Sequence, residues 1–314
     1  MSFQKIIAAF LLFVLIGGVL TGCGANASLP PPGTKRIAAD EARGIHFSND
    51  KRTLVKYNRD LPETEYTIPG EVTAIGEKAF EGCFRLTNVT IPASVTSIGN
   101  GAFEGCESLT NMTIPASVIS IGNGAFEGCG KVEFSSDNRN FFTDASGALF
   151  DRKNKTLLYF PPAFSGAYTI PDGVTAIGEA AFAGCESLTS VTIPAGVTDI
   201  GEAAFYECKN LTRVTIPASV TDIRKGAFAE CKNLTRVTIP VGVTVIEDGA
   251  FHKCESLTSV TIPASVTDIG YMAFAECKSL ARVTIPASVT DIGKEAFEGC
   301  PCETSVKKQF PNYR

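Results

Sequence analysis

The chain has 314 residues, of which 44% are hydrophobic and 19% charged, so it has enough apolar surface to bury a core, and extensive disorder is excluded. Its formal net charge of -5 and isoelectric point near 5.3 provide no basic face of the kind that nucleic-acid binding requires. Tryptophan is absent and histidine occurs only as His46 and His252, so the commonest general base and metal ligand is missing from most of the chain.

The N-terminal segment has the features of an export signal. Lys5 precedes an apolar run from Ile6 to Leu20, which is short for a bilayer span and fits the hydrophobic region of a signal peptide. Leu20-Thr21-Gly22-Cys23 is similar to a bacterial lipobox, and this resemblance implies lipidation of Cys23 and removal of residues 1–22 as a lipoprotein signal peptide. An uncleaved anchor helix is the alternative, and export follows from both.

Residues 23–36 are predicted to form the lipidated cysteine and a tether. They are small and polar with three prolines, which cannot build a core. At about 3.1 Å per residue the segment would reach roughly 40 Å. Acyl chains on Cys23 would bind the membrane with about 0.8 kcal/mol per buried CH2 group, and the tether would hold the folded part away from the bilayer.

A 23-residue repeat with the form LxxVxIPxxVxxIGxxAFxxC dominates the rest of the chain. The VxI segment alternates β-branched residues as a strand does, and the proline ends its hydrogen-bond ladder. A second short strand, VxxI, follows, and AFxxC places Ala, Phe and Cys on one side of a helical or 3-10 turn. The isoleucine before the proline occurs nine times, at Ile68, Ile91, Ile114, Ile170, Ile193, Ile216, Ile239, Ile262 and Ile285.

A unit of this size cannot bury its own apolar face, so successive turns must stack around a shared core. LxxVxI is the strand signature of leucine-rich repeats, and the full consensus resembles the BspA-like branch of that family over about residues 64 to 302. The resemblance implies an α/β repeat fold, a right-handed solenoid with a parallel sheet on one face and a short second strand and a helical or 3-10 turn in each repeat. It also implies a surface lipoprotein of the treponemal or oral-anaerobe type.

The repeat is interrupted between Cys129 and Cys185. Residues 147–162 are typical of a β-hairpin, and they align with residues 44–57 at an offset of 103 residues. We therefore predict an N-terminal hairpin cap at 37–63, a first repeat block at 64–130, a β-hairpin island at 131–167, a second repeat block at 168–300 and a C-terminal cap at 301–314.

The chain has eleven cysteines, and their spacing argues against a metal site. Zinc sites need thiolates that converge from CxxC-type steps, whereas here one cysteine follows each phenylalanine, once per turn. We expect a buried column of free thiols and no metal. Neighbouring turns about 4.8 Å apart would also allow disulfides, which the sequence leaves open. Cys302 lies outside the column and is expected at the surface.

The outward positions of the VxI strands hold the candidate binding residues. One position is threonine in repeat after repeat, which strand propensity alone explains. The other position carries arginine in several repeats, with lysine at the start of the same strands, and arginine is enriched in interface hot spots and pairs bidentately with carboxylates. The alternative is a set of solvated charges that aid solubility. The candidates are Arg213, Arg236, Arg282, Lys209, Lys232, Lys278, Thr215, Thr238 and Thr284.

No phosphate loop, nucleophile elbow or EF-hand pattern occurs, and both histidines are expected to be solvated. Asp199, Asp222 and Asp268 recur at one repeat position with Asp291, so they form a row and not a catalytic pair. We predict a non-enzymatic chain without cofactors. The leading hypothesis is an adhesin-like module whose partner is a protein, and the resemblance implies host extracellular-matrix or cell-surface proteins. The alternative is a periplasmic structural or assembly scaffold. The membrane leaflet and the oligomeric state are left open.

Overall fold

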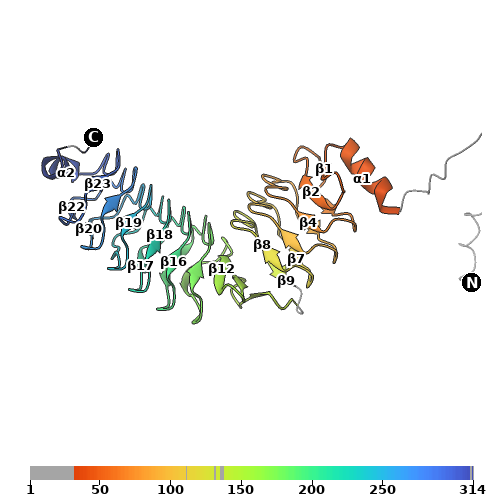
Figure 1. The fold of residues 1–314 in the computed structure, drawn as a ribbon, viewed down its shortest axis with the longest axis horizontal. Coiled ribbons are helices and arrows are strands. Elements are labelled where there is room, and N and C mark those ends of the chain that lie inside the picture. The colour runs from red at the N-terminus through yellow and green to blue at the C-terminus, as the bar shows by residue number, and fades with distance from the viewer. Residues whose placement is uncertain (1–31, 111, 131, 135–137, 312, 314) are drawn as a thin grey trace, which may run out of the picture.

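The computed structural model describes residues 32–110, 112–130, 132–134, 138–311 and 313. The predicted signal peptide, Cys23 and residues 23–31 of the predicted tether lie outside these residues. Residues 32–36, which we predicted as part of the tether, form the start of helix α1 (Pro32–Ala42). Residues 32–314 contain both hydrophobic cores and the helices at both ends, α1 at Pro32–Ala42 and α2 at Glu303–Gln309, so we expect this part to fold on its own (Figure 1). Neither helix has the length and the apolar character that crossing a membrane would require.

The chain forms a parallel β-solenoid of about ten turns with a repeat of about 23 residues. Most regular turns contribute a VxI strand to one face of the solenoid and a VxxI strand to another. We call these faces the VxI sheet and the VxxI sheet, and each consists of several shorter hydrogen-bonded sheets. The turn that contains Arg236 has only isolated β-bridges on the VxI face. The VxI strands are β3 (Glu65–Thr67), β5 (Asn88–Thr90), β7 (Met112–Ile114), β9 (Val132–Phe134), β13 (Gly166–Thr169), β15 (Leu188–Thr192), β17 (Arg213–Thr215), β20 (Ser259–Thr261) and β22 (Arg282–Thr284). The VxxI strands are β4 (Ala74–Ile75), β6 (Ser97–Ile98), β8 (Ser120–Ile121), β14 (Ala176–Ile177), β16 (Asp199–Ile200), β18 (Asp222–Ile223), β19 (Val245–Ile246), β21 (Asp268–Ile269) and β23 (Asp291–Ile292).

Equivalent repeat positions stack directly on one another in both sheets. In the VxI sheet Val191 is paired with Val214, and in the VxxI sheet Ile200 is paired with Ile223, all in parallel register. Val214 is 4% exposed and Ile223 is 2% exposed, whereas Arg213 and Thr215 on either side of Val214 are exposed. The predicted parallel sheet and its inward and outward alternation are therefore confirmed.

The helical or 3-10 turn that we predicted for AFxxC is not confirmed. The structure has consecutive turns there, and the described residues contain helices only at the two ends. Ala203 and Glu207 adopt positive φ angles of 52° and 56°, which a right-handed helix does not allow. The backbone N–H of Phe205 donates to the carbonyl of Ala227 in the next turn at 2.7 Å. The segment thus exchanges hydrogen bonds between turns, and the fold is a β-solenoid with little helix.

A ladder of phenyl rings fills the core behind the AFxxC segments. Phe205 and Phe228 stack with ring centroids 5.0 Å apart and planes 4° from parallel, and both are fully buried. At the C-terminal end Tyr313 meets Phe297 edge-on and its hydroxyl accepts a hydrogen bond from the Phe297 N–H at 2.7 Å. Tyr313 therefore covers Phe297, the last ring of the phenyl ladder, where the repeats end.

The two β-hairpins continue the VxxI sheet at the start of each block. Strands β1 (His46–Phe47) and β2 (Thr53–Lys56) are antiparallel, and β2 then pairs in parallel with β4. In the island, β10 (Phe141–Thr143), β11 (Leu149–Asp151) and β12 (Thr156–Tyr159) form an antiparallel meander, and β12 pairs in parallel with β14. Each hairpin thereby covers the first strand edge of the block that follows it.

The island also joins the two stacks of turns that Figure 1 shows. Each stack has its own hydrophobic core. Leu149 and Tyr159 pack into the core of the first block, whereas Phe150 and Phe160 pack into the core of the second. The Tyr159 hydroxyl donates a hydrogen bond to the carbonyl of Cys129 at 3.0 Å. Alternate side chains of one meander therefore connect the two blocks.

Candidate binding surfaces

The arginines of the predicted basic stripe form one column on the VxI sheet. Arg213 pairs in register with Ser190 and with Arg236, and Ser259 separates Arg236 from Arg282. All three arginines are exposed. Because parallel strands lie about 4.8 Å apart, neighbouring members of the column stand one strand spacing from each other. A parallel column two residues further along contains Thr215, Thr238 and Thr284, which are exposed as well.

The predicted lysines differ from the arginines in that each one is already paired. Lys209 contacts Glu186 at 2.6 Å, and this hydrogen bond raises the pKa of its ammonium group. Lys232 contacts Glu230 at 3.7 Å and Lys278 contacts Glu255 at 3.2 Å. Within the described part of the chain, none of the three arginines takes part in an ion pair. The unneutralised charge of the stripe is therefore carried by the arginines alone.

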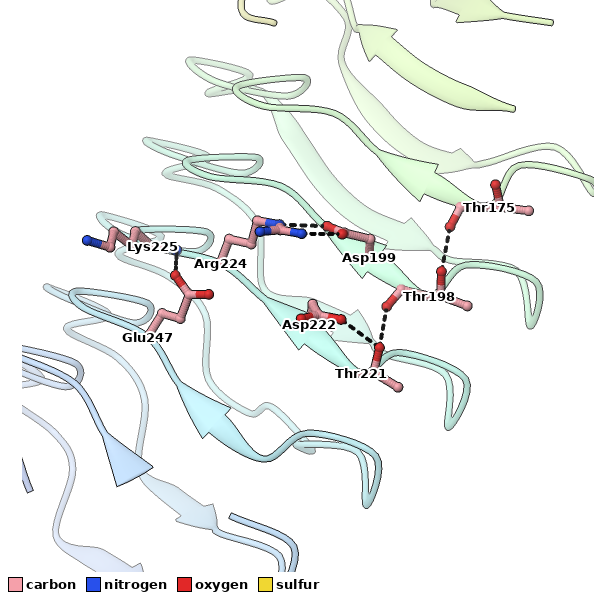
Figure 2. Close-up of polar contacts among 8 residues, drawn as sticks. All are labelled: Thr175, Thr198, Asp199, Thr221, Asp222, Arg224, Lys225 and Glu247. Atoms are coloured by element: carbon pink, nitrogen blue, oxygen red, sulfur yellow. Dashed lines mark hydrogen bonds and ion pairs between the residues drawn. The ribbon is translucent and has the colours of Figure 1, made fainter. Parts of the chain in front are cut away.

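The VxxI sheet carries a second column, of aspartates. Asp199, Asp222, Asp268 and Asp291 occupy the same position in successive turns, except that Val245 replaces one of them. Arg224 forms a bidentate pair with Asp199, with its Nε 3.1 Å from Oδ1 and a terminal nitrogen 2.7 Å from Oδ2, as Figure 2 shows. In the same view the Asp222 carboxylate accepts a hydrogen bond from the Thr221 hydroxyl at 2.7 Å.

Arg224 and Glu247 stand at a repeat position that is otherwise glycine, a departure that our sequence analysis did not single out. At Gly201 a Cβ atom would lie 2.7 Å from backbone atoms of the preceding turn, so the turns there are closely packed. Where Arg224 and Glu247 replace glycine, the hydrogen-bonded VxxI sheet ends at β18, and a new one begins at β19. An open groove of about 480 Å3 lies along these turns and includes Asp222, Val245, Asp268 and Asp291.

A larger groove of about 1080 Å3 lies where the two blocks meet. Its lining includes Glu107 of the first block, Asp144 and Phe164 of the island, and Glu186 of the second block. Asp144 is engaged by the Tyr168 hydroxyl at 2.6 Å, and Glu186 by Lys209. The acidic groups that line this groove are thus partly satisfied within the chain.

The cysteine column is buried as predicted, and the ten cysteines of the described residues are free thiols. Cys231 Sγ donates to the carbonyl of Phe205 at 3.1 Å, and the equivalent contact recurs along the column. The prediction that Cys302 lies at the surface is wrong, because it is 2% exposed. Its backbone N–H donates to the carbonyl of Leu280 at 3.0 Å as the chain turns into α2, which draws the side chain inward.

No group of three or more metal-ligating side chains is arranged for a metal among the residues that the structure describes. His46 is exposed as expected, but His252 is half-buried, and burial lowers the pKa of its imidazole.

The buried thiols have a structural role. Burial raises the pKa of the Cys254 thiol well above its ordinary value of 9.0, and the hydrogen bond to Cys277 raises that of Cys300 to about 12.

These raised thiol pKa values predict a loss of stability at alkaline pH. The folded state keeps the thiols neutral, whereas the unfolded chain ionises them above roughly pH 9. Their contribution to stability is therefore complete below that pH and is lost as the pH rises. We expect the urea midpoint of residues 32–314, followed by circular dichroism, to be flat near neutral pH and to fall above roughly pH 9.

A Cys231→Ala, Cys254→Ala variant serves as the control, since it removes two of these titrating groups. Its midpoint should decline less steeply over the same alkaline range. An unchanged slope in the variant would show that the thiols do not cause the decline.

Comparisons with known proteins found similarity over most of the chain. A family model described as BspA type Leucine rich repeat region matches residues 57–165, 163–281 and 244–309. A search of curated protein sequences gave no match. The crystal structure of a leucine rich cell surface protein from Faecalibacterium prausnitzii is 34% identical with a TM-score of 0.66, and the similarity covers 71% of this chain and 60% of that chain.

Two further solved structures are similar. A leucine-rich repeat protein from Eubacterium ventriosum is 26% identical over 79% of this chain and 88% of its own length, with a TM-score of 0.56. The pneumococcal vaccine antigen PcpA has the same TM-score of 0.56 at 18% identity, over 84% of this chain and 79% of its own, and this likeness concerns the fold alone.

Proposed function

Because the chain belongs to the BspA-type leucine-rich repeat family, we propose that it is a non-enzymatic surface protein that binds a protein partner through its VxI sheet. Proteins of this family are in general interaction scaffolds and typically lie on the bacterial cell surface. The solved structure from Faecalibacterium prausnitzii is itself described as a cell surface protein. An adhesin-like role toward host extracellular-matrix or cell-surface proteins is the form of the function that we favour.

The observation that carries this proposal is the column of Arg213, Arg236 and Arg282. These side chains are exposed on a regular sheet face and have no ion-pair partner among the described residues, whereas the neighbouring lysines are paired. A guanidinium group offers a planar fork of donors that suits carboxylates. The partner surface is therefore expected to be acidic, with Thr215, Thr238 and Thr284 as uncharged hydrogen-bonding neighbours.

The proposal includes membrane attachment through a lipid on Cys23. Residues 1–22 would be removed as the signal peptide, and the part of the tether before helix α1, residues 23–31, would connect the solenoid to the membrane. Residues 37–63 and 301–314 would be its caps. The hairpin island at 131–167 would divide the repeats into blocks at 64–130 and 168–300. We also propose that the solenoid is right-handed.

Replacement of Arg213, Arg236 and Arg282 by serine tests the proposal. Residues 32–314 are first screened for binding to purified extracellular-matrix proteins. For a matrix protein that binds, we expect the triple variant to have a dissociation constant at least roughly tenfold higher, because charge-assisted pairs are lost. The salt dependence of binding should also diminish.

The matched control removes three exposed positive charges from other places, through Arg139→Ser, Lys153→Ser and Lys308→Ser. This variant should bind as the unchanged protein does. Equal binding by both triple variants would show that the arginine column is not the contact surface.

A periplasmic scaffold without a host ligand is the alternative function. Protease treatment of intact cells separates the two, since a surface adhesin should be degraded without permeabilisation of the envelope. Protection until the envelope is opened would contradict the adhesin-like role.

A further inference from the structure

The second repeat block carries two columns of unpaired charge with opposite sign, one on each sheet. The basic column consists of Arg213, Arg236 and Arg282, with Ser259 as its neutral member. Since one turn separates successive members, the arginines occupy the first, second and fourth of four consecutive turns. Their side chains are exposed.

The acidic column lies on the VxxI sheet of the same turns. Asp222, Asp268 and Asp291 form no ion pair among the described residues, and Val245, which is 41% exposed, is the neutral member. The aspartates thus occupy the first, third and fourth of four turns. Asp199 would extend the column, but the bidentate contact of Arg224 neutralises it, as Figure 2 shows.

Nearby lysines do not compensate the acidic column. Lys225 lies 3.4 Å from Asp248 and Lys294 lies 2.9 Å from Glu295, so both are engaged next to the column and not within it. The three aspartates line the open groove of about 480 Å3 on this sheet. A partner could therefore approach them without displacing an existing ion pair.

The unpaired charges of the two columns all match in only one relative direction. With the solenoid axes antiparallel, Arg213 faces Asp291, Arg236 faces Asp268 and Arg282 faces Asp222, while Ser259 faces Val245. With the axes parallel, at most two arginines face an unpaired aspartate. In the one parallel register where all three arginines face aspartates, Arg213 faces Asp199, which Arg224 already neutralises. Both columns share the spacing of parallel strands, about 4.8 Å, because both belong to the same solenoid.

We propose that the arginine column of one copy binds the aspartate column of a second copy, with the two solenoids antiparallel. This inference rests on the proposed function in that it assigns a partner to the same arginine column. Each Arg–Asp contact is a charge-assisted hydrogen-bonded pair, and wrong registers are disfavoured because they bring charges against neutral residues. The two faces are different, so the contact is heterologous and leaves one free face at each end.

Two variants test the contact. Arg213→Ser, Arg236→Ser, Arg282→Ser retains only the acidic column, and Asp222→Asn, Asp268→Asn, Asp291→Asn retains only the basic one. In sedimentation velocity at low ionic strength, residues 32–314 should associate with rising concentration, and each variant alone should associate at least roughly tenfold more weakly. A mixture of the two variants should form a one-to-one complex and stop there.

The direction of the contact is tested by zero-length carbodiimide crosslinking. An Arg213→Lys variant places a reactive amine at the end of the basic column, and it should become linked to Asp291 of another copy. Linkage to Asp222 or to Asp199 would mean a parallel arrangement and would overturn the proposal.

A monomeric unchanged protein at low ionic strength would also overturn the proposal, and so would a mixture of the two variants that stays monomeric. These results are distinguishable from a failure of the proposed function. If the arginine variant loses binding to a matrix protein while the unchanged protein is monomeric, the proposed function holds and self-association is wrong.

Discussion

Replacement of Phe228 by alanine is expected to lower the free energy of unfolding by about 3–5 kcal/mol. Phe228 is fully buried, and its ring stacks on Phe205 at 5.0 Å and on Phe251 at 5.5 Å between centroids. The substitution would open a void in the middle of the phenyl ladder, which the hydrogen-bonded turns on either side prevent from collapsing. Equilibrium urea unfolding of residues 32–314, followed by circular dichroism, measures the loss.

Phe84→Ala is the matched control, because the side chain of Phe84 is 53% exposed and lies outside the ladder. We expect that change to cost well under about 1 kcal/mol, as surface substitutions usually do. If the two variants unfolded at the same urea concentration, the ladder would not be the source of the stability that we assign to it.

The second large effect is expected at Gly201, where the change to alanine should cost about 1–3 kcal/mol through overpacking. A Cβ atom there would stand 2.7 Å from the Glu179 nitrogen and from the Gly178 carbonyl carbon. Backbone atoms cannot rotate away as a flexible side chain can, so the two turns must separate. The same urea experiment measures the effect.

Gly70→Ala is the control, since a Cβ atom at Gly70 would have no neighbour within 4 Å. That change should be neutral or slightly stabilising, because alanine restricts the unfolded chain more than glycine does. Equal stability of the Gly201 and Gly70 variants would contradict the close packing of the turns.

The repeating part of the fold could be predicted from the sequence because its determinants recur at a fixed spacing. Alternation around Val214 determines which side chains face the core, and the 23-residue period puts equivalent residues side by side in both sheets. The conformation of AFxxC was not predictable in this way. Its apolar spacing suits a helix, but its N–H groups bond to the next turn, as that of Phe205 does to Ala227, and local periodicity contains no such information.

The candidate site was predicted in part. Outward placement of Arg213 and Lys209 follows from strand alternation, but only the structure distinguishes the free arginine from the paired lysine. Glu186, the partner of Lys209, lies 23 residues earlier, so comparison of charges one repeat apart could have found this pair. The same comparison would have identified Arg224 at a glycine position. The burial of Cys302 depends on the path of the last turn, which no repeat predicts.

The most direct test of the arginine column is a footprint of its bound partner, whether a matrix protein or a second copy. Phenylglyoxal modifies accessible arginines, and mass spectrometry measures the extent of modification at each one. We predict that partner binding protects Arg213, Arg236 and Arg282 while Arg139 and Arg152 are modified as before. If the complex forms and the three column arginines are modified to the same extent as in the free protein, the arginine column is not the contact surface.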